Sequence, residues 1–239
     1  MAYEIHALYD NLILHLKMFK HSRLSYTILT ILCSHIMLFD ETSSETLADN
    51  GSNLNIIKVL NTSELLWLYW QTSPNDYTET LKDFTINETL TCIRNRMTNI
   101  STTEYYFEQT TVLVGKVYAE SAAPVKITDY YKGIFVNDTI PPKSMNVYDI
   151  DQTPDSPSTL MTLQYTDENL ACSVFFVFGL DNSLEDDVGS CVMYIRDSHV
   201  KDGPSNGCKT FFQNRCNSTK TYQPYSDDCK KENKEVNQD

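Results

Sequence analysis

Apolar residues occur along this chain in short runs rich in β-branched and aromatic side chains, with turn-forming segments between them. This pattern is typical of β-strands, and Pro, Asn, Asp, Gly and Ser between the runs mark the turns. Two further segments have helical character, residues 54–60 and 203–216. Many short strands without intervening helices predict an all-β fold, an antiparallel barrel or sandwich. The expected strands are residues 64–72, 90–97, 104–114, 116–119, 133–136, 145–150, 160–165, 171–178 and 191–196.

The N-terminal region has the pattern of a targeting segment. Residues 24–39 form a short apolar run that follows Lys17, Lys20 and Arg23, as in a secretory signal. We therefore expect residues 1–39 to be a signal segment, with Met18 as an alternative natural start. A polar lead-in (40–55), one domain (56–229) and a charged disordered tail (230–239) are expected to follow.

Cysteines and glycosylation motifs also indicate secretion. Of seven cysteines, Cys33 lies within the signal segment, and the remaining six are enough for three disulfides. Six N-x-S/T motifs predict N-glycosylation, at Asn50, Asn61, Asn87, Asn99, Asn137 and Asn217. The sequence therefore predicts an extracellular, glycosylated and cross-linked protein.

Charge and histidine content narrow the classes of function. The chain has 19 Lys and Arg against 32 Asp and Glu, a net charge of −13, so it is expected to repel nucleic acids. Of its five histidines only His199 lies beyond residue 35, which argues against catalytic triads, histidine zinc sites and histidine relays. We expect a binding protein and not an enzyme, with no cofactor, no metal and no membrane partner.

Several segments in the second half of the chain are more specific. They are YTDENLACSV (165–174), CVMYIRD (191–197) and GPSNGC (203–208), followed by Cys216 and Cys229. Together with ELLWLYWQT (64–72) and Cys92, they resemble the tick salivary lipocalins, the family that includes the histamine-binding proteins. The resemblance covers about residues 56–229. It implies an eight-stranded antiparallel up-and-down barrel with a C-terminal helix and an enclosed cavity.

The resemblance also implies how the six cysteines pair. It favours Cys172–Cys208 and Cys92–Cys229, which leaves Cys191–Cys216. Each bridge is expected to contribute roughly 3–5 kcal/mol by restricting the unfolded chain. These cysteines are expected to be structural.

Strand alternation assigns side chains to the cavity. If Cys172 and Cys191 point outward, their neighbours at alternate positions point inward. On the first strand the inward set is either Trp67, Tyr69 and Gln71 or Leu66, Leu68 and Trp70. Because lipocalins place a tryptophan inside near the barrel floor, the resemblance favours the first set. Alternation then assigns Ser173, Phe175, Val177, Val192 and Tyr194 to the cavity, and the resemblance adds Trp67 and Tyr69. Tyr148 is a further aromatic candidate whose facing the sequence leaves open, and the resemblance implies Glu120 as the one acidic member.

These positions bear on the type of ligand. Amine-binding members of the family carry carboxylates where this chain has Ser173 and Val192, and a buried cation without a carboxylate is costly. Only Glu120 is left to bind an amine. An acidic lipid would need basic groups at the cavity, for which the candidates are Arg94, Arg96, Lys116 and Arg196.

The resemblance therefore implies a secreted salivary protein that sequesters a small host inflammatory mediator. An apolar or lipid ligand is favoured over histamine. The alternatives are a residual amine binder and an immunomodulator whose barrel is a scaffold for binding a host immune protein, such as complement or a cytokine.

Overall fold

The computed structural model describes residues 54–81, 84–117, 120–121, 123–151, 155–180, 189–216 and 220–231. The expected signal segment with Cys33, residues 40–53 of the lead-in and residues 232–239 of the tail lie outside this part. So do the motifs at Asn50 and Asn217. The description below concerns only these residues.

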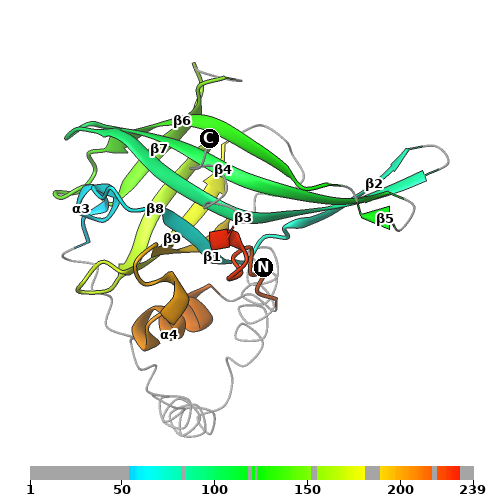
Figure 1. Ribbon diagram of the computed structural model, residues 1–239. Coiled ribbons are helices and arrows are strands. Elements are labelled where there is room, and N and C mark those ends of the chain that lie inside the picture. Colours follow the sequence, from blue (N-terminus) through cyan, green and yellow to red (C-terminus); the bar gives the residue numbers. More distant parts are fainter. Residues whose placement is uncertain are drawn as a thin grey trace, which may run out of the picture. The chain divides into compact units, whose positions relative to one another are not determined.

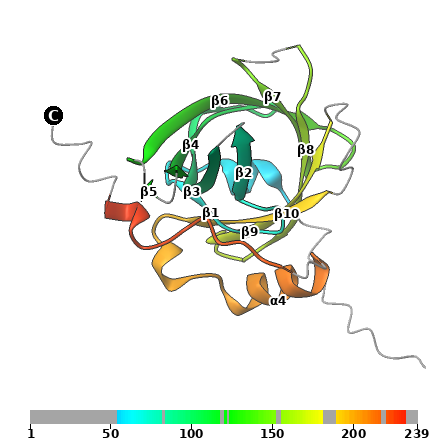
Figure 2. The same cartoon turned by 90° about the vertical axis from the view of Figure 1, so that its right-hand side faces the viewer.

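Ten strands form one antiparallel sheet, and eight of them close into a barrel. Going round the barrel, the order is β1-β10-β9-β8-β7-β6-β4-β3, and β3 pairs again with β1. Figure 2 shows the barrel viewed along its axis. The predicted eight-stranded lipocalin barrel is confirmed. The barrel strands are β1 (Leu66–Gln71), β3 (Phe84–Ile100), β4 (Glu104–Val117), β6 (Val125–Val136), β7 (Ser144–Asp149), β8 (Thr159–Thr166), β9 (Cys172–Gly179) and β10 (Ser190–Arg196).

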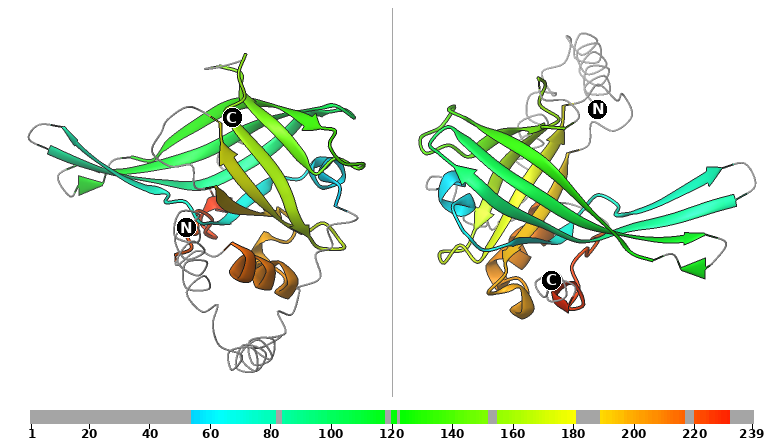
Figure 3. Two further views of the ribbon diagram at one scale, coloured as in Figure 1. Left: turned by 180° about the vertical axis from the view of Figure 1, so that it is seen from behind. Right: turned by 45° about the horizontal axis from the view of Figure 1, so that its top comes forward.

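Two strands are much longer than the barrel needs. β3 has 17 residues and β4 has 14, and their paired halves extend beyond the ring as an arm (Figures 1 and 3). The remaining two strands, β2 (Asp76–Leu81) and β5 (Glu120–Ser121), flank this arm. We call this end of the barrel the arm end.

The sequence did not predict the arm. The separate strand expected at 116–119 is wrong for Lys116 and Val117, which continue β4 because Gly115 stays paired with Glu88. The strand expected at 133–136 is the last part of the 12-residue β6. Its first half was not predicted, although Val125 and Ile127 alternate with polar residues there, and both of these apolar side chains are exposed in the structure.

A short helix, α3 (Ile56–Leu60), covers the opposite end of the barrel, which we call the α3 end. The side chain of Asn55 caps it by accepting a hydrogen bond from the Lys58 amide, at 3.1 Å. The Ile56 amide donates to the Pro142 carbonyl at 3.0 Å. Ile56 and Leu60 are buried in the same cluster as the inward side chains of the barrel. This helix therefore forms part of the barrel interior.

The C-terminal segment packs on the outside of the barrel. A 3₁₀ turn, η2 (Val200–Asp202), leads into helix α4 (Asn206–Arg215), which lies beside the barrel in Figure 2. Ser205 caps α4 by accepting from the Cys208 amide at 3.1 Å. Phe211 of α4 stacks on Tyr165 of β8 with ring centroids 5.0 Å apart. The expected C-terminal helix is thus present.

Three disulfides join this outer layer to the barrel. They are Cys92–Cys229, Cys172–Cys208 and Cys191–Cys216, with Cα–Cα distances of 5.2, 6.4 and 5.8 Å. These distances are normal for disulfides, and the pairing confirms the one implied by the family resemblance. Each bridge joins a barrel strand to the C-terminal segment, so all three hold the same layer in place.

We expect the bridges to differ in their contribution to stability. Cys92–Cys229 spans 137 residues and Cys191–Cys216 only 25. Replacing the first pair by serine should lower the free energy of unfolding by about 5 kcal/mol, and replacing the second by about 3.5 kcal/mol. Urea denaturation of the two double variants measures the difference. A larger loss from the second pair would show that loop entropy does not set the order.

Candidate ligand-binding site

The barrel sorts its side chains into two separate clusters. All eight barrel strands and α3 contribute to an inner cluster, and a different set packs between the barrel and the C-terminal segment. This separation follows from the alternation of side chains along each strand. The buried members of the inner cluster are Leu54, Ile56, Val59, Leu60, Leu66, Leu68, Ile93, Tyr105, Phe107, Phe135, Met145, Val147, Met161, Leu163, Phe175, Val192 and Tyr194.

Three aromatic rings form a stack along the inner wall. Tyr105 and Phe107 of β4 have ring centroids 5.0 Å apart, and Phe107 lies 5.2 Å from Tyr131 of β6. The stack follows from the register, because Phe107 is directly opposite Tyr131. Across the interior, Phe175 meets Tyr194 edge to face at 5.9 Å. Aromatic walls with a few polar groups are a common property of small-molecule sites.

A chain of hydrogen bonds joins three strands inside the barrel. The Gln109 side chain donates to Asn95 Oδ1 at 2.9 Å, and Asn95 in turn bonds the hydroxyl of Tyr194. Burial raises the pKa of Tyr194 to about 12, although the bond from Asn95 acts in the opposite direction. The groups of this chain are therefore uncharged at neutral pH.

Two buried donors at the α3 end are not paired in this way. Tyr105 is 1% exposed, and its hydroxyl has no hydrogen-bond partner among the described residues. The same holds for Nε of Arg196, whose Nη2 donates to the Val59 carbonyl at 3.3 Å. Arg196 lies opposite the inward Leu66, so it shares the inner face. Burial raises the pKa of Tyr105 far above its ordinary value.

Carboxylates lie on the inner face toward the arm end. Asp129 is opposite Gln109, and Asp149 is opposite Tyr131. Partial burial raises the pKa of Asp129, and the negative charges of Asp149 and Asp151 raise it further. Burial, followed by these same carboxylates, raises the pKa of Tyr131 to about 12. This end of the interior is therefore electronegative.

The structure places five predicted cavity residues on the inner face. Phe175, Val192 and Tyr194 are buried in the inner cluster, and Val177 packs against it. Ser173 is opposite Tyr194, is 3% exposed, and its hydroxyl lies 2.9 Å from that of Thr166. A ligand-binding role for these five residues remains a prediction.

The placement of Trp67 and Tyr69 inside the barrel is wrong. Trp67 is fully buried in the outer cluster, and Tyr69 packs against that cluster. The inward residues of β1 are Leu66 and Leu68. A bulge between Leu68 and Trp70 then resets the alternation, so Trp70 also faces outward, against Phe212.

Two further predicted positions do not join the site. Tyr148 lies opposite Lys132, which in turn is opposite the outward Tyr106, so Tyr148 faces outward and its assignment to the cavity is wrong. Glu120 belongs to β5 in the arm, and its side chain lies outside the described part. The carboxylates that do face inward, Asp129 and Asp149, were not anticipated.

Sequence reasoning missed most of the polar groups of the interior. Asn95, Gln109 and Asp129 come together through pairing of β3, β4 and β6. Side chains alternate along a strand, so Tyr105 and Gln109 share the face of Phe107. The sequence alone does not show which face that is. On β3 the bulge at Cys92, where φ is +52° and the register with β4 shifts, interrupts the alternation, so the facing of Asn95 does not follow from the residues before the bulge.

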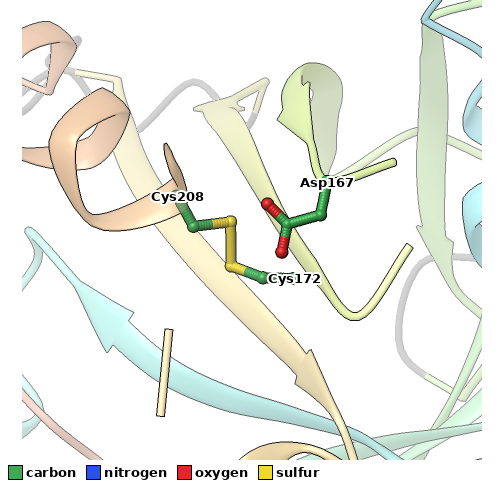
Figure 4. A group of neighbouring side chains, drawn as sticks. All are labelled: Asp167, Cys172 and Cys208. Carbon is green, nitrogen blue, oxygen red and sulfur yellow. A yellow bond between two sulfur atoms is a disulfide. The ribbon is translucent and has the colours of Figure 1, made fainter. Parts of the chain in front are cut away.

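One cluster with metal-ligand chemistry lies outside the barrel. Asp167, Cys172 and Cys208 come within 4.8 Å of one another, as Figure 4 shows. The two cysteine sulfurs are joined in a disulfide and provide no thiolate. The Asp167 carboxylate accepts from Ser205 at 2.8 Å and so joins the β8–β9 turn to the cap of α4. This cluster is structural.

Four of the six glycosylation motifs lie in the described part. Their asparagines are exposed at Asn61, Asn87, Asn99 and Asn137. Exposure makes these positions accessible for modification, and attachment of glycans remains a prediction. No helix in the described part of the chain is both long and apolar enough to span a membrane.

The charge on Asp129 gives a prediction for stability. The pKa of Asp129 is higher in the folded protein than in the unfolded chain, so folding favours the protonated acid. As the pH rises from the unfolded-state pKa through the folded-state pKa, ionisation of Asp129 therefore lowers the free energy of unfolding. Asp129→Asn should therefore raise the Tm at pH 7 and have no such effect near pH 3. In a domain of this size a change of about 1 kcal/mol in the free energy of unfolding shifts the Tm by roughly 2–4 °C. The increase in Tm should be smaller than this, because solvent screens the half-buried carboxylate. Thermal melts at both pH values test this, and a lower Tm at pH 7 would contradict it.

Comparison with known proteins places this barrel in a family. Similar solved structures include japanin from Rhipicephalus appendiculatus bound to cholesterol (12% identity, TM-score 0.43, 71% of this chain and 97% of that one). The AM182–serotonin complex is another, with 13% identity and a TM-score of 0.40 over 74% of this chain and 92% of that one. Apocrustacyanin C2 is a third, with 12% identity and a TM-score of 0.43 over 80% of this chain and 90% of that one. No curated protein matches the sequence. The family model described as tick histamine binding protein matches residues 44–231, which is most of the chain. The chain therefore belongs to the tick histamine-binding protein family.

Proposed function

We propose that this protein is secreted in saliva and sequesters a small, mainly apolar host mediator inside its barrel. The observation that carries this proposal is the single inner cluster to which all eight strands and α3 contribute. Removing an alkyl chain from water contributes about 0.8 kcal/mol per CH₂ group, so such an interior can bind tightly without a buried ion pair. Capture of this kind is stoichiometric and depends on affinity and on the amount of protein secreted.

Features outside the barrel support secretion and a rigid binding site. Three disulfides join the C-terminal segment to β3, β9 and β10, and cross-links of this type persist in oxidising compartments. The inner aromatic residues lie on strands fixed at both edges by pairing. A site built on rigid strands loses little entropy when a ligand binds.

A pair of neighbouring residues on β9 tests the proposal. Val177 is inward and partly buried, whereas Phe176 is outward and 38% exposed. Val177→Trp should fill the interior and reduce the affinity for an apolar ligand at least about tenfold, because the bulky ring occupies the space of the ligand. Phe176→Trp is the matched control and should leave binding unchanged.

Native mass spectrometry of both variants from secreting eukaryotic cells provides the measurement. The control and the wild type should carry a co-purified small molecule that Val177→Trp lacks. Equal loading of both variants would place the ligand outside the barrel and overturn the proposal. Tryptophan fluorescence of the wild type is a poor reporter here, because Trp67 and Trp70 both pack outside the barrel.

The inward carboxylates favour a second candidate function, capture of a cationic amine toward the arm end. Asp129 and Asp149 flank the ring of Tyr131, whose pKa both of them raise. An ammonium group is stabilised by a carboxylate and by the face of an aromatic ring. This amine site is independent of positions 173 and 192, where amine-binding members of the family carry carboxylates and this chain has Ser173 and Val192.

Titration with histamine and serotonin distinguishes this candidate. Binding should weaken at least about tenfold in Asp129→Asn, since the half-buried carboxylate that neutralises the amine is lost. It should also weaken in the wild type as the pH falls through the raised pKa of Asp129, because the protonated acid no longer neutralises the amine. Asp138→Asn, an exposed site in the β6–β7 turn, is the control. Amine binding that is indifferent to Asp129→Asn would rule out this site.

A further inference from the structure

The hydroxyl of Tyr105 differs from most polar groups of the barrel interior. Several inward side chains are paired with one another: Gln109 with Asn95, Asn95 with Tyr194, and Ser173 with Thr166. Tyr105 is 1% exposed, and its hydroxyl has no partner in the described part of the chain. A buried hydroxyl without a partner destabilises the fold, and phenylalanine would fill the same space without this cost.

The position of Tyr105 limits what its hydroxyl can meet. Tyr105 lies on the inner face of β4, opposite Gly133, and belongs to the same cluster as the α3 residues Ile56 and Val59. Its ring stacks on Phe107, which fixes the ring plane. The hydroxyl is therefore held inside the apolar half of the barrel, away from the carboxylates at the arm end.

A second buried donor at the same end has the same property. Arg196 faces inward opposite Leu66, and Nε has no partner in the described part of the chain, although Nη2 is bonded to Val59. Burial holds Tyr105 in its protonated form, so both groups offer hydrogens. Two donors without acceptors at one end of an apolar interior favour a ligand with an oxygen acceptor.

We propose, on the basis of the proposed function, that Tyr105 donates a hydrogen bond to an oxygen at the leading end of the bound ligand. The ligand class is an apolar chain or ring system that ends in a hydroxyl, carbonyl or carboxylate oxygen and enters oxygen first, toward α3. Arg196 Nε is the second donor on this face, and it strengthens the case for a carboxylate. Tyr105 is thus a specificity-determining residue, which rejects ligands whose buried end has only donors.

Three probes with the same ten-carbon chain test this proposal. They are 1-decanol and decanoate, which have an acceptor oxygen, and decylammonium, which has only donors. Calorimetry compares the full-length secreted wild type, freed of bound lipid, with Tyr105→Phe. Tyr106→Phe is the matched control, because it makes the same change on the neighbouring outward residue, whose hydroxyl bonds Glu104.

We expect Tyr105→Phe to weaken decanol binding about 3- to 10-fold and decanoate binding more than about 10-fold. Decylammonium binding should change less than about 2-fold. In the unliganded protein the same variant should keep or raise the Tm, by up to roughly 2–4 °C, because it removes an unpaired buried group. A purely structural tyrosine would not combine an unchanged or higher Tm with a selective loss of the two oxygen ligands.

The outcomes separate the two proposals. Wild-type binding of decanol and decanoate that Tyr105→Phe leaves unchanged overturns the role of Tyr105 and leaves the proposed function intact. A lower Tm in unliganded Tyr105→Phe also overturns that role, because the hydroxyl would then have a partner within the protein. Failure of all three probes to bind the wild type overturns both proposals.

Discussion

The packing of Trp67 on the outside of the barrel is the constraint on which the site depends. Its indole donates to Asp197 Oδ1 at 2.7 Å, Arg94 lies 5.1 Å above the ring, and Tyr225 meets the ring edge at 5.3 Å. A buried indole N–H needs an acceptor, whereas among the described residues the cluster around Leu66 and Leu68 consists of hydrophobic side chains. With Trp67 held outside, alternation turns these two leucines inward. Cys92–Cys229 and the ion pair between Lys230 and Asp197 hold the C-terminal segment over the same ring.

The barrel could be predicted from the sequence, whereas the arm and the facing of β1 could not. The motifs in the second half of the chain and the order of the six cysteines carried the family resemblance, which implied the disulfides. The outward cysteines also fix the alternation of β9 and β10. That is why Ser173, Phe175 and Tyr194 are on the predicted face. β1 has no cysteine, and its Leu-Trp-Leu-Tyr-Trp run is apolar on both faces, so hydrophobicity alone does not distinguish them. The bulge after Leu68 shifts the register within the strand, which no strict alternation can represent.

The polar part of the site depends on contacts between strands far apart in sequence. Asn95 reaches Gln109 because β3 pairs with β4, and it reaches Tyr194 because the ring places one strand, β1, between β3 and β10. Tyr105 has no sequence signal of its own, since a tyrosine in a strand usually finds a partner when it is buried. Only the folded structure distinguishes it, because its buried hydroxyl has no partner among the described residues.

The distribution of charge inside the barrel follows from the cost of burying ions. Near the arm end, Asp129 is half-buried, and its pKa is already raised by partial burial and by its neighbours. A carboxylate at the position of Asn95, which is 7% exposed, would have a much larger penalty. An amide there bonds Tyr194 and Gln109 without any charge. The deeper groups are therefore mostly neutral, and a ligand oxygen that reaches Tyr105 would exchange its hydrogen bonds with water for a donor that has no partner among the described residues. Recognition by such a donor depends first on the position of one oxygen, and the inward Arg196 at the same end provides the positive charge that a carboxylate would need in the barrel of an acidic protein.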